Sequence, residues 1–210
     1  MKLYDCTPAP SPKRVRMFIH EKGLEVEKIQ IDLMSGQQRT EDFKKINPWS
    51  TVPVLELEDG TTISEISACC RYIEEMHPTP PLLGKNPKEK AVIEMWNQHM
   101  EMDGFMAAVD VFRNSAKGFT SRAKAGPNNY EQIPALADRA SQQLTDFFDL
   151  LNQRLGDHKF IVGDDFSVAD ITAFVTIEFA KWSKITPSNE VHNNVKRWFD
   201  EINQRPSSKA

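Results

Sequence analysis

The residues best placed to do chemistry lie between positions 47 and 72, in the stretch NPWSTVPVLELEDGTTISEISACCRY. A strand is predicted to start at Val52-Pro53, and a helix near Glu65, after a turn and a second strand. A proline that leads a strand lacks an N–H and favours an extended or edge position. A cis bond before it would turn the Val52 backbone outward, toward an extended ligand. A helix N-terminus offers unpaired N–H groups and partial positive charge to a carboxylate. Together these features predict a cradle for a small anionic peptide.

Short strand and helix patterns alternate over the first 77 residues and supply the frame for this cradle. Their order is strand, helix, strand, helix, strand, strand, helix, which implies a small mixed sheet with helices on its faces. The segment from Thr7 to Pro12 carries three prolines and predicts a rigid turn, with the first helix beginning near Pro12 and ending at Gly23. We also predict strands at 2–5 and 26–31 and helices at 40–46 and 65–76.

A proline-rich segment, residues 77–87, separates this region from a second one in which strand patterns nearly vanish. Apolar residues there recur at helical spacing and predict helices at 88–112, 134–155, 167–182 and 193–204. The third of these is nearly apolar all round, which predicts a central position. We therefore predict an α/β domain at 1–77, a linker at 78–87 and an all-α bundle at 88–210.

Composition and charge argue against several classes of protein. The chain has 210 residues, a formal net charge of −4 and a pI near 5.8, so it lacks the basic field that nucleic-acid binding uses. No apolar run approaches the roughly 20 residues that span a bilayer, and the N-terminus lacks the apolar core of a secretory signal. The three cysteines form no C-x-x-C pair and the five histidines show no ligand spacing, which predicts no metal site. A reducing, cytoplasmic setting suits this composition.

Asp170 invites a catalytic interpretation, but its context favours a structural one. Ser167 and Asp170 have the spacing of a capping box, in which Ser167 caps a helix and the Asp170 carboxylate reaches back to the Ser167 N–H. We therefore expect replacement of Asp170 by alanine to lower stability far more than ligand affinity.

The order of these elements resembles that of the cytosolic glutathione transferases over nearly the whole chain. The resemblance rests on four motifs in the same order: Lys13-Arg14-Val15-Arg16 with Glu21-Lys22-Gly23, Asn47-Pro48 with Val52-Pro53-Val54-Leu55, Ser64-Glu65 with Arg71-Tyr72, and Gly163-Asp164 with Phe166-Ser167-Val168-Ala169-Asp170. The pattern looks closest to the theta-like and nu-like bacterial and fungal enzymes. The resemblance implies a thioredoxin-like domain that binds glutathione, an all-helical second domain, a homodimer and a cytoplasmic detoxification enzyme.

The resemblance assigns the cradle to glutathione, as a co-substrate. It implies that Pro53 follows a cis peptide bond and that the Val52 backbone pairs with the cysteinyl part of glutathione. Gln38 and Arg39 fall where the family places contacts to the glycine carboxylate.

The helix that begins at Glu65 is implied to hold the γ-glutamyl carboxylate. Glu65 matches the family position, but Ile66 stands where the family usually has a serine. The N–H of Ile66 remains while a hydroxyl donor is lost, and one neutral hydrogen bond contributes about 0.5–1.5 kcal/mol. Thr51, where theta-like enzymes often carry a lysine, is a second change of this kind. Weaker glutathione binding, but not its loss, is expected.

The group that activates the thiol is the main departure from the family pattern. Theta-like enzymes use a serine after the first strand, and the matching position here is Ala9. The same alignment puts Ala9-Pro10-Ser11-Pro12 where glutaredoxins carry Cys-Pro-x-Cys, so that disulfide chemistry is missing too. Ser11 either caps the first helix, with Pro12 as its first residue, or donates to the ligand sulfur. We expect the helix N-terminus and a bound water to stabilise the thiolate, with Ser11 as the assisting catalytic residue.

The resemblance places the second substrate between the domains, against the first helix of the bundle. Phe112, Asn114 and Ser115 are expected to line that pocket, where Asn114 and Ser115 can supply polar contacts near the sulfur. An apolar pocket with a few polar groups suits a small hydrophobic electrophile.

Three functions remain open at this point. The first is a glutathione transferase that conjugates glutathione thiolate to small hydrophobic electrophiles. The second is a glutathione-dependent disulfide or peroxide reductase. The third is a binding module that keeps the transferase fold without turnover, a possibility that Ala9 and Ile66 favour.

Overall fold

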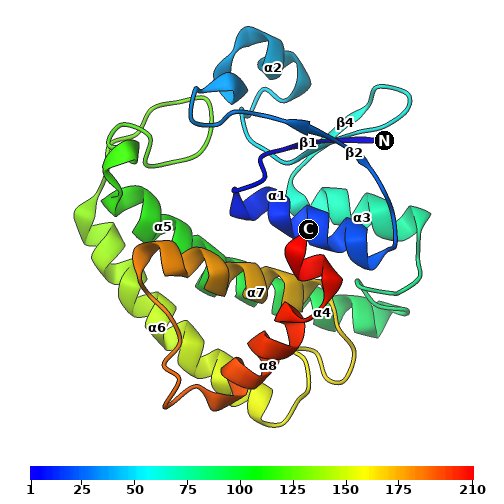
Figure 1. Ribbon diagram of the computed structural model, residues 1–210, viewed down its shortest axis with the longest axis vertical. Coiled ribbons are helices and arrows are strands. Elements are labelled where there is room, and N and C mark those ends of the chain that lie inside the picture. The colour runs from blue at the N-terminus through cyan, green and yellow to red at the C-terminus, as the bar shows by residue number, and fades with distance from the viewer.

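The N-terminal third of the chain forms a four-stranded sheet with helices on both faces. The computed structural model describes all 210 residues, and Figure 1 shows this α/β domain above a larger helical domain. The α/β domain contains β1 (Lys2–Asp5), α1 (Pro10–Glu21), β2 (Glu27–Gln30), α2 (Glu41–Ile46), β3 (Val54–Glu56), β4 (Thr62–Ser64) and α3 (Ile66–Met76). This order confirms the predicted succession of strands and helices.

The sheet is mixed, with the strand order β2-β1-β3-β4. β1 runs parallel to β2 and antiparallel to β3, and β3 pairs antiparallel with β4. In this register Val54 pairs with Tyr4 on one side and with Ser64 on the other. The carboxyl ends of β1 and β2 therefore lie together, and the residues just before β3 and just after β4 lie beside them.

The sheet separates two apolar regions. α1 and α3 cover the face that looks toward the helical domain, whereas α2 lies on the opposite side (Figure 1). Val15 and Phe18 of α1 and Ile73 of α3 are fully buried in the main core, which continues into the helical domain. On the other side, Phe43 of α2 packs edge-on against Tyr4, with ring centroids 6.2 Å apart.

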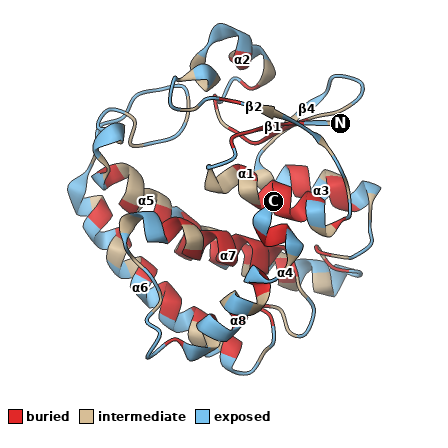
Figure 2. Ribbon diagram, in the orientation of Figure 1, coloured by how far each residue is buried: buried red, intermediate tan, exposed pale blue.

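The second domain is built of helices, as predicted. It contains α4 (Pro87–His99), a π-helical segment (Met100–Phe105), α5 (Met106–Ser115), α6 (Pro134–Gly156), α7 (Val168–Ala180) and α8 (Asn193–Asn203). Every residue of α7 except Glu178 is buried, and Figure 2 shows this helix at the centre of the bundle, which confirms its predicted position. None of the helices combines the length and the apolar character needed to cross a membrane.

The first helix begins earlier than predicted. It starts at Pro10, with Ala9 as its N-cap, and not near Pro12. Both prolines fit into the first turn, because the N–H groups of that turn have no intrahelical partner to lose. The expectation that Ser11 caps the helix is therefore wrong, since Ser11 is already the second helical residue. Gly23, left-handed at φ +66, follows the end of the helix as predicted.

The helix predicted at 88–112 is not one regular α-helix, because the π-helical segment joins α4 to α5. Gly104 in this segment lies against the ring of Phe147 on α6, where an added Cβ would come within 2.6 Å of the ring. Glu101, also in the segment, forms an ion pair with Arg14 of α1. The irregular turn therefore carries both a close helix contact and a bridge between the domains.

The predicted capping box at the start of α7 is confirmed. Asp170 Oδ2 accepts a hydrogen bond of 3.0 Å from the N–H of Ser167, and the Ser167 side chain bonds the first turn in return. Asp170 is completely buried and also accepts from the N–H of Ile161. The residue therefore ties a loop to the helix and presents no surface to a substrate.

Ion pairs join α1 to the helical domain near both of its ends. Near its start, Lys13 Nζ lies 2.7 Å from Glu178 Oε2 on α7. At its end, Glu21 accepts hydrogen bonds of 2.8 and 2.7 Å from Arg205. These contacts hold the N-terminus of α1 in one position relative to the second domain.

Candidate active site

Four segments meet at the carboxyl end of β1: the β1–α1 connection, the β2–α2 connection, the loop before β3 and the start of α3. The Val52–Pro53 peptide bond is cis, as the family resemblance implies. The Val52 side chain lies in a small apolar cluster with Cys6 and Ala9. Neither the N–H nor the C=O of Val52 makes a hydrogen bond. A backbone segment without hydrogen bonds thus lies beside the start of α1.

The turn before Val52 is held by the Asn47 side chain. Its Nδ2 donates to the Thr51 carbonyl at 2.9 Å, and its Oδ1 accepts from the Trp49 N–H at 3.1 Å. Ser50 is left-handed, with φ +55, and its buried hydroxyl has no hydrogen-bond partner. Asn47 therefore fixes the direction in which the Val52 backbone leaves the turn.

The start of α3 lies next to this backbone, because Ser64 pairs with Val54 and Glu65 follows at once. Glu65 is exposed and has φ +69, a conformation that costs a residue with a Cβ on the order of 1–3 kcal/mol. No side chain caps the helix, so its first N–H groups are open to a ligand. Ile66 is half-buried, and its side chain packs against the main core.

The start of α1 offers a single free N–H group. The two prolines of its first turn have none, and the N–H groups of Ala9 and Lys13 donate to the carbonyls of Cys6 and Ala9, at 2.8 and 3.3 Å. Ser11 is half-buried, and both its N–H and its hydroxyl lack a partner. The partial positive charge of the helix end is therefore presented to a ligand through Ser11.

None of the three cysteines is placed as a nucleophile. Cys6, Cys69 and Cys70 are free and buried. Burial raises the pKa of Cys6, and it raises the pKa of Cys69 to about 12. Because the thiolate is the reactive form, these groups are protonated and unreactive near neutral pH.

Gln38 and Arg39 lie in the connection between β2 and α2, and their surroundings differ. The Arg39 guanidinium donates to the carbonyls of Gly126 and Asn128 and to Asn129 Oδ1, at 2.8 to 3.3 Å. These four bonds to the helical domain leave one of its five N–H groups free. Gln38 makes no such bond, and its enclosed Oε1 has no partner. Gln38 is therefore free of protein partners, whereas Arg39 is mostly engaged.

Two of the three residues expected to line the second-substrate pocket make hydrogen bonds to the backbone. Asn114 is buried, its Nδ2 donates to a carbonyl one turn earlier on α5 at 2.9 Å, and its Oδ1 accepts from the Ile133 N–H at 3.0 Å. The Ser115 hydroxyl donates to the carbonyl one turn before it at 2.6 Å. Asn114 thus fastens α5 to the start of α6, and Ser115 bonds to its own helix. Their contacts with a second substrate stay a prediction.

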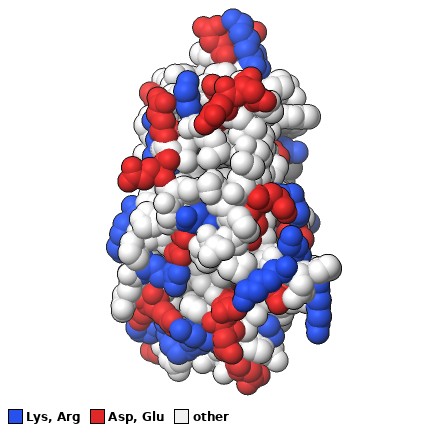
Figure 3. Space-filling view, turned by 90° about the vertical axis from the view of Figure 1, so that its right-hand side faces the viewer, with Lys and Arg blue, Asp and Glu red and all other residues white.

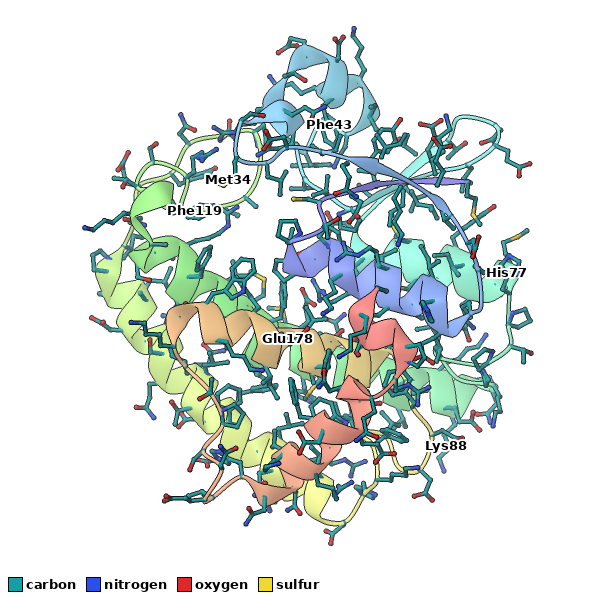
Figure 4. All side chains as sticks on the ribbon, viewed as in Figure 1. Met34, Phe43, His77, Lys88, Phe119 and Glu178 are labelled. Carbon is teal, nitrogen blue, oxygen red and sulfur yellow. The ribbon has the colours of Figure 1, made fainter.

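Phe112, the third of these residues, belongs to a row of aromatic rings whose contacts no sequence motif predicts. Its ring packs edge-on against Phe119, Phe179 and Trp182, at centroid distances of 5.1, 5.4 and 5.5 Å. Two of these rings come from the end of α7 and one from the loop after α5, so no sequence period joins them. Glu178, next to Phe179 in the chain, pairs with Lys13, so the end of α7 lies beside α1 (Figure 4).

A hollow of about 260 Å³ lies away from these groups, between α3, α4 and α7. Ser67 and Arg71 of α3 and Glu94 and Asn97 of α4 line it. On the side of α3 and α4, basic and acidic side chains are mixed, so no field of one sign marks this face (Figure 3). No group of three or more His, Cys, Asp or Glu side chains is arranged to hold a metal ion.

Two family models match the chain, one over each domain. The model for the glutathione S-transferase N-terminal domain matches residues 10–76, and that for the C-terminal domain matches residues 97–206. Glutathione S-transferase 2 of Saccharomyces cerevisiae is 34% identical over 211 residues, which cover 100% of this chain and 88% of the relative.

Solved structures agree with this match over the whole chain. A glutathione S-transferase domain-containing protein from Marinobacter aquaeolei has a TM-score of 0.91 at 34% identity, covering 99% of each chain. Gtt2 from Saccharomyces cerevisiae also has a TM-score of 0.91, at 32% identity, covering 100% of this chain and 99% of the other. Fold, motif order and sequence identity lead to one conclusion: the chain belongs to the glutathione S-transferase family.

Proposed function

We propose that this protein joins the sulfur of glutathione to small hydrophobic electrophiles. The observation that carries the proposal is the unpaired backbone of Val52 beside a helix start whose single free N–H belongs to Ser11. The first can align the cysteinyl part of glutathione like an added strand, and the second meets the sulfur where a thiolate gains from the helix dipole. The names of the relatives support glutathione as the co-substrate.

We assign the two ends of glutathione to groups that stay open around Val52. The γ-glutamyl carboxylate meets the uncapped start of α3, through N–H groups at Glu65 and Ile66. The glycine carboxylate accepts from the side-chain N–H groups of Gln38 and from the one remaining N–H of Arg39. Pro53 has no N–H of its own, so the backbone contact with the cysteinyl part of glutathione is made by Val52.

The reaction needs a thiolate at neutral pH. A free thiol has a pKa of about 8.5, and a helix N-terminus lowers that value by favouring the anion. Ser11 supplies one N–H and one hydroxyl, and we expect a bound water to supply a further donor. The sulfur then forms a bond to the electrophilic carbon, the leaving group departs with its bonding electrons, and the thiol proton passes to solvent.

A pair of Ser11 variants tests this assignment. Ser11→Ala removes the hydroxyl and keeps the N–H, whereas Ser11→Pro also removes the N–H and is compatible with a first helical turn. We expect the pKa of bound glutathione, followed by thiolate absorbance, to rise in Ser11→Ala and to rise further in Ser11→Pro. An unchanged pKa in both variants, at unchanged thermal stability, would exclude Ser11 from thiol activation.

The two alternative functions give different outcomes in parallel assays. A glutathione-dependent reductase exchanges disulfides and leaves an aryl halide unreacted, but the buried cysteines provide no internal thiol for it. A binding module binds glutathione and turns over neither substrate. Failure to bind glutathione at millimolar concentration would exclude both enzymatic functions.

We also expect a homodimer that acts in the cytoplasm. The hollow between α3 and α4 lies on a face of mixed charge that a second copy can cover, and three free cysteines suit a reducing compartment. Light scattering measures the assembly directly: a dimer has twice the chain mass of 24.0 kDa, and a particle of the single mass would contradict this expectation.

A further inference from the structure

The end of α5 and the loop that follows it carry an unbalanced positive charge. Residues 113–132 hold four basic side chains and one acidic side chain, namely Arg113, Lys117, Arg122, Lys124 and Glu131. Four positive charges and one negative charge give this segment +3, in a chain whose formal net charge is −4. None of these five side chains forms an ion pair.

Two of the arginines gather around one aromatic ring. Cζ of Arg113 lies 4.7 Å from the ring centroid of Phe119, and Cζ of Arg122 lies 5.9 Å from it. Nη1 of Arg113 donates to the Arg122 carbonyl at 2.6 Å. Burial, and then the nearby charges of Arg122 and Arg39, lower the pKa of Arg113. We call Arg39, Arg113 and Arg122 the arginine cluster.

The protein does not neutralise the arginine cluster itself. Asp110, one turn before Arg113 on α5, forms no ion pair; burial raises its pKa, and the charge of Arg139 acts against that rise. Glu178, at the end of the aromatic row, is paired with α1. Glu131 is exposed on the loop and forms no ion pair. An uncompensated group of cations of this kind attracts an anion from outside the chain.

The arginine cluster also has a fixed place relative to the candidate active site. Phe119 packs against Phe112, and Phe112 packs against Phe179 and Trp182 at the end of α7. Phe179 also packs against Phe105, whose ring centroid lies 3.8 Å from Cζ of Arg14 on α1. The aromatic rings thus form a continuous row from α1 to the arginines. A flat apolar molecule along this row has one end near the sulfur and the other end at the cations.

We propose that Arg113 and Arg122, supported by the charge of Arg39, form a subsite for a carboxylate of the second substrate. The preferred electrophile is then a flat aromatic or conjugated molecule that carries one carboxylate at the end away from its reacting carbon. The guanidinium fork matches a carboxylate with two parallel hydrogen bonds and stacks on aromatic rings. This proposal rests on the proposed transferase activity, of which it defines the substrate class.

The glycine carboxylate of glutathione is a second carboxylate that the same cations can attract, because Arg39 is also assigned to it. The carboxylate of glutathione and that of the electrophile can be told apart by changing the thiol. Glutathione carries the glycine carboxylate and γ-glutamylcysteine lacks it. Kinetics with both thiols therefore separate an effect on the thiol from an effect on the electrophile.

The test uses a chlorodinitrobenzoate and its methyl ester, which share ring and leaving group and differ in charge. With either, sulfur bonds to the ring carbon and chloride leaves with the C–Cl electron pair. We compare kcat/KM for the benzoate with that for the ester, each divided by its uncatalysed rate. The wild-type ratio should favour the benzoate, and Arg122→Gln should lower it about 10-fold to 100-fold, the size of a lost charge-assisted hydrogen bond. Arg122→Lys should restore part of the ratio.

Lys88→Gln is the matched control, because it removes one exposed, unpaired positive charge from α4, far from Phe119 (Figure 4). The ratio in this variant should equal that of the wild type. A wild-type ratio that favours the ester, or an unchanged ratio in Arg122→Gln, overturns the proposal. So does a rise of KM for glutathione but not for γ-glutamylcysteine at an unchanged ratio, since the cluster would then serve the glycine carboxylate.

A binding measurement keeps the test independent of turnover. If the wild type converts neither electrophile, the proposed transferase function fails, and the subsite is judged by equilibrium binding alone. A dinitrobenzoate without chlorine cannot react, and its contact with the aromatic row should quench tryptophan fluorescence. Weaker binding in Arg122→Gln but not in Lys88→Gln supports the subsite, and equal binding in all three proteins overturns it.

Discussion

Trp198 Nε1 donates a hydrogen bond of 2.9 Å to Asp170 Oδ1, and both side chains are completely buried. The same oxygen accepts from the Ile161 N–H at 3.0 Å, and Oδ2 accepts from the N–H and the hydroxyl of Ser167 at 3.0 and 3.1 Å. One carboxyl group therefore joins α7 to α8 and to the loop before α7. Its role is to hold the helical domain together, far from any substrate.

Asp170→Ala should lower the free energy of unfolding by about 2–4 kcal/mol, because it removes a helix cap and leaves buried donors without an acceptor. Glutathione affinity of the remaining folded protein should stay at its wild-type value. Urea unfolding and calorimetric titration measure the two quantities. Asp165→Ala is the control, since that side chain is 91% exposed. A loss of affinity without a loss of stability would contradict the structural role.

The stability of the protein should also respond to pH through Asp170. Burial raises the pKa of this carboxyl from 3.8 to about 6, against the opposing effect of its hydrogen bonds. The folded state therefore binds more protons than the unfolded state between about pH 4 and 6, and this contribution to stability falls as the pH rises through that range. Urea unfolding across the range should show a weaker pH dependence in Asp170→Asn. Equal slopes in both proteins would rule Asp170 out as the source.

Ser50→Gly should raise the free energy of unfolding by roughly 0.5–1 kcal/mol, because the gain from relieving a left-handed residue exceeds the added chain entropy of glycine. The variant also removes a buried hydroxyl that has no partner. Ser50→Ala separates the two effects, since it removes the hydroxyl but keeps the Cβ at φ +55. Equal gains in both variants would mean that backbone strain contributes nothing.

Gly104→Ala should destabilise the helical domain by about 1–3 kcal/mol, the usual cost of overpacking. The new Cβ would lie 2.6 Å from the ring of Phe147, which has no room to move in the core. Gly118→Ala is the control, because nothing lies within 4 Å of a Cβ at that position. Thermal unfolding of both variants measures the difference, and equal melting temperatures would refute the close contact.

Arg39→Gln should free the segment 126–129, because it removes four hydrogen bonds between the domains. Amide hydrogen exchange in the absence of glutathione should become faster in that segment and stay unchanged in α6. Lys45→Gln, on the neighbouring α2, removes a charge that is 76% exposed and serves as the control. Wild-type exchange rates in Arg39→Gln would show that this residue does not hold the loop.

Much of the fold could be predicted because its signals are local. The capping box of Ser167 and Asp170, the stop at Gly23 and the start of a helix at Pro134 each depend on a few neighbouring residues, and the structure confirms all three. The two-domain order followed from the change of hydrophobic period after the proline-rich segment. The start of α1 was missed by two residues, because a proline is allowed anywhere in a first helical turn.

The local structure around the candidate site could be predicted where it is continuous in the chain, as for the cis bond before Pro53 and the helix start near Glu65. It could not be predicted where side chains from distant segments meet. Sequence spacing cannot show that Arg39 bonds the segment 126–129 or that Phe112 joins rings on α7. The hydrogen bond from the Ile133 N–H to Asn114 escaped prediction for the same reason, since it forms only when α6 folds back along α5. Periodicity and capping act within a few residues, whereas the pocket depends on the packing of helices, which only the folded chain brings about.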